Sequence, residues 1–248
     1  MDGGAAKRIA AACVSQDLTR VLEVGAGTGA LTRALLDCGA SVTAIEIDPD
    51  LVEILRERDD LAAADIVEAD ALAFDYGAFG EGGTWCAAGN LPYNIATPLI
   101  VGWLEGPSPP QRIVAMVQRD VAERLTAQPS TPHYGSLTLL ARYWTTPKRA
   151  FVLGPGVFYP RPNVDSAVVV LERRLVPAVE ARDPAFLMQV VRGGFAYRRK
   201  TLVNSLSLAL EIERERTRAA LSALDIDTEI RAEQLDLGAF AALADKLA

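Results

Sequence analysis

The sequence of 248 residues has a mass of 26.5 kDa and a formal net charge of −7, with 50% hydrophobic and 23% charged residues. This composition is typical of a globular protein of one or two domains and excludes a disordered, collagen-like or membrane-spanning chain. No apolar run approaches the ~20 residues that cross a bilayer, and the first residues lack the apolar stretch of a signal peptide, so we expect a cytoplasmic protein without a membrane partner.

The first 118 residues alternate short β-branched runs with segments of helix length. Strands are predicted at 20–24, 40–46, 65–69, 84–89 and 112–118. Apolar residues at helical spacing predict a helix that ends at Gly39, and Pro49 after the capping residue Asp48 predicts the start of another. This alternation predicts an α/β fold with a doubly wound parallel sheet.

The pattern changes after residue 118. It predicts a helix near 119–128, a loop at 129–133, a helix around 135–144, and strands at 148–153 and 166–172 that join the sheet antiparallel. From Asp183 onward strand signals vanish, and short helices are predicted within 183–195, 200–210, 215–224 and 238–248. Because prolines at 177 and 184 mark a break, we predict a catalytic sheet domain over 1–176 and a helical domain over 177–248.

Cysteine and charge patterns limit the chemistry. The three widely spaced cysteines form no C-x-x-C pair, so we expect neither a disulfide framework nor a metal site.

Residues 142–200 hold 11 basic and 4 acidic side chains, although the whole chain is acidic. A polyanion would dock on this segment, while a charge run taken alone is more often a solvated face.

A glycine turn follows the first strand at Gly25, Gly27 and Gly29. Glycines allow a tight turn and close approach of a ligand to the backbone at a helix N-terminus, so the turn predicts a nucleoside cofactor. Gly25, Gly27 and Ala30 also match the pattern G-x-G-x-x-A, which leaves NAD or a merely structural turn open. Glu46 ends the second strand, where an acid can bind both ribose hydroxyls or simply cap the sheet edge.

Two further segments follow the third and fourth strands. Asp70 could accept a hydrogen bond from the amine of a cofactor adenine, although such a residue is more often a helix N-cap.

The segment Asn90–Asn94 (NLPYN) could activate a base amine, because the Asn90 amide oxygen and the Leu91 carbonyl before the fixed Pro92 can accept both amine N–H groups. Tyr93 offers a flat face for base stacking, worth ~1–3 kcal/mol. No general base is then required, and we assign no catalytic role to His133.

With these residues in place, the chain resembles the KsgA-type ribosomal RNA adenine dimethyltransferases, which are Rossmann-like methyltransferases of class I that use S-adenosylmethionine. The resemblance covers nearly the whole chain and rests on Glu23–Gly29, Glu46, Asp70–Leu72, Asn90–Leu99, Met116–Leu125, Tyr134–Leu139, Val157–Val168 and Phe195–Leu206. It implies an antiparallel final strand and a small C-terminal helical domain.

The resemblance also implies roles for individual residues. The glycine loop would hold the methionine part of the cofactor, Glu46 the ribose and Asp70 the adenine amine, so that the cofactor-binding set is Glu23, Gly25, Gly27, Gly29, Glu46, Asp70, Ala71 and Asn90. The catalytic set is Asn90, Leu91, Pro92, Tyr93 and Phe158, with a flipped adenine between Tyr93 and Phe158. The phosphate contacts of the RNA would come from Arg192, Arg198, Arg199 and Lys200.

The resemblance implies that the substrate is a pair of adjacent adenosines in a hairpin loop near the 3′ end of small-subunit RNA, within a 30S assembly particle. Each adenosine would be dimethylated. We expect the protein to be a monomer. Two alternatives stay open: an assembly or RNA-binding factor with little turnover, and a large-subunit RNA methyltransferase of the resistance type. The family carries a Gly-Gln-Asn-Phe-Leu motif upstream of the segment that matches Asp2–Ala11. The sequence begins after that motif, so we expect weak cofactor binding and weak methyl transfer.

Overall fold

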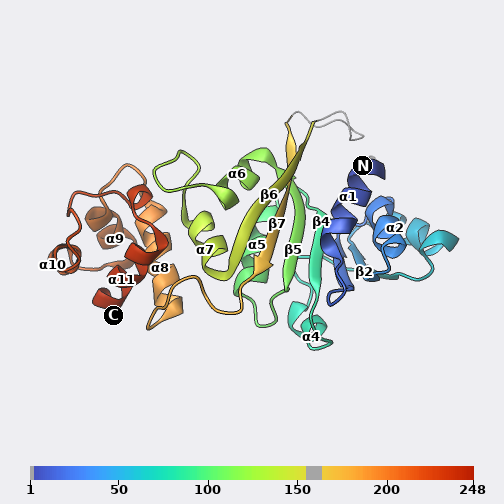
Figure 1. The fold of residues 1–248 in the computed structure, drawn as a ribbon, viewed down its shortest axis with the longest axis horizontal. Helices are drawn as coiled ribbons and strands as arrows, with labels where there is room; N and C mark the ends of the chain where they lie inside the picture. Colours follow the sequence, from blue (N-terminus) through green and yellow to red (C-terminus); the bar gives the residue numbers. More distant parts are fainter. Residues whose placement is uncertain (1–2, 155–163) are drawn as a thin grey trace. The chain divides into compact units, whose positions relative to one another are not determined.

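The computed structural model describes residues 3–154 and 164–248 (Figure 1). The chain divides into two compact units, one formed by residues 1–122 and 146–173 and the other by residues 123–145 and 174–248. The first unit contains a sheet with helices packed on it, and the second unit is built from helices. None of the helices in the described ranges is long and apolar enough to cross a membrane.

The sheet has seven strands in the order β3-β2-β1-β4-β5-β7-β6. Their bounds are β1 Arg20–Val24, β2 Ser41–Glu46, β3 Asp65–Glu68, β4 Cys86–Asn90, β5 Arg112–Gln118, β6 Thr145–Leu153 and β7 Ser166–Arg173. The strands from β3 to β5 pair in parallel, whereas β7 pairs antiparallel with β5. The predicted α/β sheet with its antiparallel final strand is therefore confirmed.

The strand order changes direction between β1 and β4. Because crossovers between parallel strands are right-handed, connections that run in opposite directions place their helices on opposite faces, which makes the sheet doubly wound. In such sheets ligands bind beyond the carboxyl ends of the strands at this switch point. The segments that follow β1, β2 and β4 are therefore where a site is expected.

The helices of the sheet unit follow the predicted alternation. They are α1 Gly3–Cys13, α2 Ala30–Asp37, α3 Pro49–Arg56, α4 Tyr76–Gly80, α5 Ala96–Glu105 and the start of α6 Arg119–Thr126, with a 3-10 turn η1 at Asp59–Leu61. The predicted cap of α3 is confirmed, since the Asp48 carboxylate accepts the Asp50 N–H at 3.0 Å. Sequence reasoning missed α1, which buries small residues against α2, β4 and β5.

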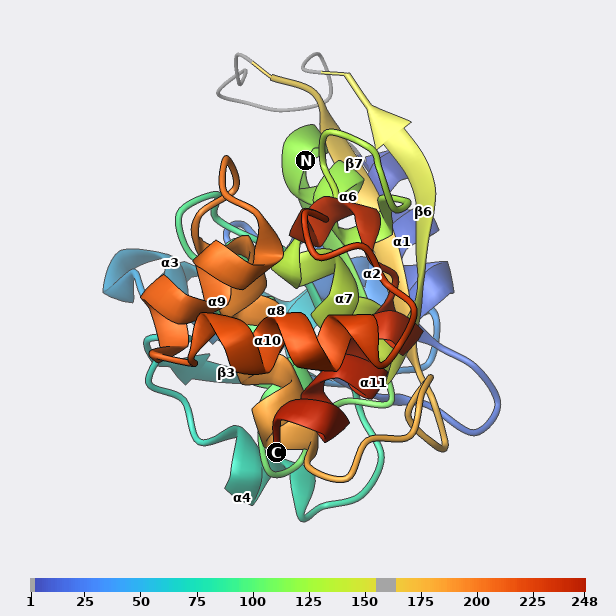
Figure 2. The same cartoon turned by 90° about the vertical axis from the view of Figure 1, so that its left-hand side faces the viewer.

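The second unit consists of α7 Ser136–Trp144, α8 Pro184–Ala196, α9 Leu202–Leu210, α10 Arg214–Ser222, the 3-10 turn η3 Ala232–Gln234 and α11 Leu237–Leu247. Helix α8 packs against α9 and α11, and α10 lies across α9 and α11 (Figure 2). In this unit the partly buried ring of Phe195 packs against the buried rings of Tyr134 and Phe240, with its centroid 5.9 Å from each of theirs. A Cβ at Gly193 would come within 2.9 Å of Leu210, so glycine there allows α8 and α9 to approach closely.

The compact units differ from the predicted domain ranges in one segment. Residues 123–145, placed by sequence in the sheet domain 1–176, group with the helices because α7 packs against α8 and α11. The second unit resumes at Arg174, close to the expected start at residue 177. The domain assignment itself stays a prediction.

Candidate active site

The loop between β1 and α2 is a rigid backbone turn. The φ angles of Gly25, Gly27 and Gly29 are 75°, 57° and 81°, a region that residues with a side chain rarely adopt. The N–H groups of Gly25 and Ala26 donate to the Ile45 carbonyl near the end of β2, at 2.9 and 3.2 Å. A Cβ added at Gly27 would meet nothing within 4 Å, so the space beside this residue is open to a ligand.

Glu46 connects the glycine loop to the end of β2. Its side chain is buried, with Oε2 accepting the Gly27 N–H at 2.8 Å and Oε1 accepting the N–H groups of Ile47 and Asp48 at 2.9 and 3.2 Å. A carboxylate oxygen can accept more than one hydrogen bond, so Oε2 keeps capacity for a ligand hydroxyl. The alternative of a surface acid that caps the sheet edge agrees with these three backbone hydrogen bonds but not with the burial of the side chain.

Glu23 lies on β1, two residues before the glycine loop, and is 1% exposed. The pKa of its carboxyl group is raised from the ordinary value of 4.5 to about 8, chiefly because burial penalises the charged form; hydrogen bonding with Thr32 offsets part of this rise, and the nearby charge of Glu46 contributes to it. At neutral pH the group is therefore mostly protonated. Its Oε2 atom has no hydrogen-bond partner among the residues that the structure describes. A buried polar atom of this kind is usually satisfied by a ligand or an ordered water.

Asp70 and Ala71 follow β3. The exposed Asp70 carboxylate accepts the Leu72 N–H at 2.9 Å, and its carbonyl accepts the Ala73 N–H at 3.0 Å, so the residue closes a tight turn rather than capping a helix. The side chain of Ala71 is buried. The Ala69 N–H donates to the Glu46 carbonyl at 3.0 Å, which fixes this turn beside the end of β2.

The predicted catalytic turn begins at the last residue of β4. Asn90 is the last residue of the strand and pairs with Met116 of β5, whose carbonyl accepts the Leu91 N–H at 3.1 Å. The Leu91 side chain is buried, whereas Asn90, Pro92 and Tyr93 are exposed. The Pro92 carbonyl accepts the Ala96 N–H at 3.0 Å and so begins α5. The turn therefore presents its polar groups outward from a fixed backbone.

Tyr93 is anchored at one end and open at the other. The residue is 40% exposed, and its hydroxyl group lies 3.3 Å from Oγ of Ser166 at the start of β7. This contact fixes the hydroxyl end of the Tyr93 side chain to β7. Sequence reasoning missed the role of Ser166, because nothing local links it to a residue 73 positions earlier.

The structure brings the glycine loop and the turn that begins at Asn90 together. A Cβ on Gly25 would lie 3.8 Å from the Asn90 carbonyl oxygen and 3.9 Å from Pro92 Cδ, because β1 and β4 are parallel neighbours. Glu46 is bonded to the same loop. Glycine loop, acid and turn thus meet at the switch point of the sheet.

The remaining predicted residues lie elsewhere. Phe158 falls outside the described residues, so its stacking role stays a prediction. Arg192 on α8 and Arg198, Arg199 and Lys200 after it are all exposed on the second unit. Arg198 donates to the Pro132 carbonyl at 2.9 Å, which joins Arg198 to the loop before α7 in the same unit. The structure thus places four cations on the surface, as phosphate contacts require.

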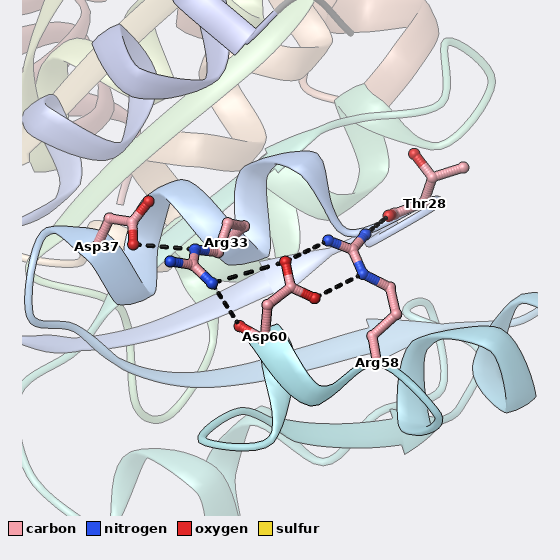
Figure 3. Close-up of polar contacts among 5 residues, drawn as sticks. All are labelled: Thr28, Arg33, Asp37, Arg58 and Asp60. Atoms are coloured by element: carbon pink, nitrogen blue, oxygen red, sulfur yellow. Dashed lines mark hydrogen bonds and ion pairs between the residues drawn. The ribbon is translucent and has the colours of Figure 1, made fainter.

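Three further residues near the switch point were not identified from sequence. Ile47 and Leu72 are large apolar side chains that are 64% and 51% exposed, directly after Glu46 and after the Asp70–Ala71 pair. Arg58 donates to the backbone of the glycine loop (Figure 3). Residues 3–154 and 164–248 contain no group of three or more His, Cys, Asp or Glu side chains that could hold a metal ion.

The fold and the loop define a Rossmann-like methyltransferase of class I, and comparison with known proteins identifies the branch. The family described as ribosomal RNA adenine dimethylase matches residues 2–248. This chain belongs to the ribosomal RNA adenine dimethylase family. Ribosomal RNA small subunit methyltransferase A of Pseudomonas aeruginosa is 41% identical over 249 residues, which cover 100% of this chain and 91% of the relative.

Two solved structures share the fold. A dimethyladenosine transferase from Plasmodium falciparum superposes with a TM-score of 0.79 at 24% identity, covering 97% of this chain and 94% of that one. The 23S rRNA methyltransferase ErmE superposes with a TM-score of 0.75 at 26% identity, covering 100% and 98%. The chain is an rRNA adenine dimethyltransferase with S-adenosylmethionine as its cofactor, and the NAD interpretation of the glycine loop is not supported.

Proposed function

We propose that this protein dimethylates the exocyclic amines of two adjacent adenosines in a hairpin loop near the 3′ end of small-subunit rRNA. The substrate in this proposal is a 30S assembly particle in the cytoplasm, and the protein acts as a monomer. The observation that supports it most directly is the exposed turn Asn90–Tyr93 beside the glycine loop. The 41% identity to a small-subunit methyltransferase favours this substrate over large-subunit RNA.

The residues at the switch point fit S-adenosylmethionine. The open space beside Gly27 and the unpartnered oxygen of Glu23 can receive the methionine part, and Glu46 retains acceptor capacity for the ribose. The exposed side chains of Ile47 and Leu72 offer apolar surface on which an adenine ring would lie near Asp70. When bound, the cofactor supplies a methyl group on a positively charged sulfonium, which an amine can displace.

The turn after β4 would make the adenine amine a nucleophile. The Asn90 side chain is exposed, so its amide oxygen can accept one amine N–H. The Leu91 N–H is bonded to Met116, which fixes the backbone that presents the Leu91 carbonyl to the second N–H. Accepting both hydrogen bonds localises the nitrogen lone pair, and positioning then carries the catalysis.

The rest of the substrate would be held by stacking and charge. The ring of Tyr93, fixed through Ser166, would stack on the flipped adenine, with Phe158 as the expected partner on its other face. The exposed cations Arg192 and Arg198–Lys200 would contact RNA phosphates and orient the loop. Sequence recognition would then depend on unstacked loop bases, since the major groove of A-form RNA is too narrow to read.

Nucleoside mass spectrometry tests the proposed substrate. Under-methylated 30S particles and free large-subunit RNA are incubated with the protein and labelled cofactor, and dimethyladenosine is quantified in each. We expect label in the small-subunit RNA alone. Label confined to large-subunit RNA would overturn the substrate assignment, and particle binding without any methylation would favour an assembly factor.

A further inference from the structure

The carbonyl of Thr28, in the middle of the glycine loop, is held by a side chain from a distant segment. Arg58, which lies between α3 and η1, donates from Nη1 to the Thr28 carbonyl oxygen at 2.5 Å (Figure 3). Its Nε and Nη2 atoms donate to the two carboxylate oxygens of Asp60 at 3.0 and 2.7 Å. A two-point contact of this kind fixes the plane and direction of a guanidinium group.

A second arginine holds Asp60 from the other side. Arg33 on α2 donates to the Asp60 carbonyl at 3.2 Å and lies 3.6 Å from its carboxylate, and it also pairs with Asp37 at 2.9 Å. Figure 3 shows the four charged side chains in a row that ends at Thr28. The Asp60 carboxylate raises the pKa of Arg58, and Arg58 lowers the pKa of Asp60, as expected for a mutually stabilised pair.

The bond to Thr28 controls an entire peptide unit. The Thr28 carbonyl and the Gly29 N–H belong to one planar peptide, and that N–H donates to the Ala26 carbonyl at 2.9 Å. Arg58 therefore holds one side of the peptide while Ala26 holds the other. Because Gly27 and Gly29 both have positive φ, rotation of this peptide would disturb the loop on both sides.

The same segment packs against the loop without space to spare. A Cβ at Gly29 would lie 2.6 Å from Leu61, 2.9 Å from Leu55 and 3.1 Å from Arg58 Nη1. The side chains of Arg58 and Asp60 remain 34% and 41% exposed, and ion pairs of this exposure contribute little to global stability. The consequence of the pairing should therefore be found in the loop rather than in the stability of the fold.

We propose that Arg58 is a positioning residue for cofactor binding, which holds the glycine loop in its binding conformation through the Thr28 carbonyl, and that Asp60 and Arg33 keep it aimed there. This inference rests on the proposed role of the loop in binding S-adenosylmethionine. Arg58 itself touches neither cofactor nor substrate in this scheme. Its removal should therefore weaken cofactor binding while leaving the methyl-transfer step at Asn90 intact.

The test compares Arg58→Ala and Asp60→Asn with Arg56→Ala as the matched control. Arg56 also donates to a backbone carbonyl, that of Ile66 at 2.9 Å, but this carbonyl belongs to β3 and not to the loop. Affinity for S-adenosylhomocysteine is measured by calorimetry, and hydrogen exchange of the amides of residues 25–29 is followed by mass spectrometry. Melting temperatures verify that each variant folds.

We expect Arg58→Ala to weaken binding about 10-fold, the effect of removing one charge-assisted hydrogen bond, and Asp60→Asn about 3-fold. Loop amides should exchange faster in both, KM for S-adenosylmethionine should rise, and kcat should stay within about 2-fold of the wild type. Arg58→Lys, which retains a single donor, should recover part of the affinity.

The outcomes separate the two proposals. If wild-type protein does not bind S-adenosylhomocysteine, the proposed cofactor site is overturned together with this inference. If the wild type binds but Arg58→Ala binds equally well, or Arg56→Ala loses as much affinity, only the role of Arg58 is overturned.

Discussion

The buried acid Glu23 should make the stability of the sheet unit depend on pH in a calculable way. Its pKa rises from 4.5 to about 8 on folding, chiefly because burial penalises the charged form. Between these values the folded chain retains a proton that the unfolded chain has released. Folding stability therefore falls as pH rises through this window and levels off above pH 8, where both states are ionised.

The size of the effect follows from the same interval. A pKa shift of one unit corresponds to about 1.4 kcal/mol, so the shift from 4.5 to about 8 lowers the free energy of unfolding by up to about 5 kcal/mol between the two ends of the window. The substitution Glu23→Gln keeps a neutral side chain of the same shape and removes the ionisation. We expect the variant to match the wild type near pH 5 and to become progressively more stable than the wild type by pH 8.

Urea denaturation between pH 5 and 8.5, followed by tryptophan fluorescence, measures this difference. Trp85 and Trp103 are buried in the same unit as Glu23 and report on its unfolding. Glu68→Gln is the control, since it removes an exposed carboxylate from the end of β3 and should retain the wild-type slope. Parallel curves for the wild type and Glu23→Gln would refute the assignment of Glu23 as a neutral buried acid.

Three further predictions concern the substrate. Asn90→Ala should lower kcat by at least ~100-fold in the nucleoside assay while particle binding persists, whereas Asn94→Ala, at an exposed neighbouring residue, should change kcat little. Full activity of Asn90→Ala would remove Asn90 from the mechanism. Tyr93→Phe should reduce activity by less than about 10-fold because it removes only the hydroxyl group that contacts Ser166, whereas Tyr93→Ala, which removes the ring, should raise KM for RNA roughly 5- to 100-fold. Equal losses of activity in the two variants would argue against stacking on the ring. Changing Arg198–Lys200 to Glu should weaken RNA binding and reduce the slope of log affinity against log salt concentration by about one for each phosphate that the protein no longer neutralises. An unchanged affinity at low salt would show that these residues are only a solvated surface.

Local patterns were sufficient to predict the sheet and the backbone of its site. The strand predicted at 20–24 and the strand predicted at 112–118 coincide with β1 and β5, because runs of β-branched residues in a buried strand carry their signal in the sequence itself. The glycine turn was predictable for a similar reason: its three positive φ angles require glycine. The position of Asn90 at the carboxyl end of β4 then followed from parallel strand order.

The features that sequence did not reveal depend on distant contacts. Helix α1 was missed because it begins with two glycines and buries mainly alanines, which give a weak helical pattern. The grouping of residues 123–145 with the helices depends on packing against α8 and α11, which no local signal contains. Arg58 precedes an ordinary turn in the sequence, and its contact with Thr28 spans 30 residues.

Two acids at neighbouring strands show why burial must be known before a role is assigned. Sequence placed Glu23 and Glu46 together as cofactor-binding acids, yet Glu46 accepts three backbone N–H bonds while Glu23 lies buried with an unpartnered oxygen. The charge of Glu46 is one reason why the pKa of Glu23 is raised. At neutral pH Glu23 is therefore mostly protonated and can donate a hydrogen bond as well as accept one. A ligand group bound beside Glu23 would therefore meet a neutral acid and not a second carboxylate.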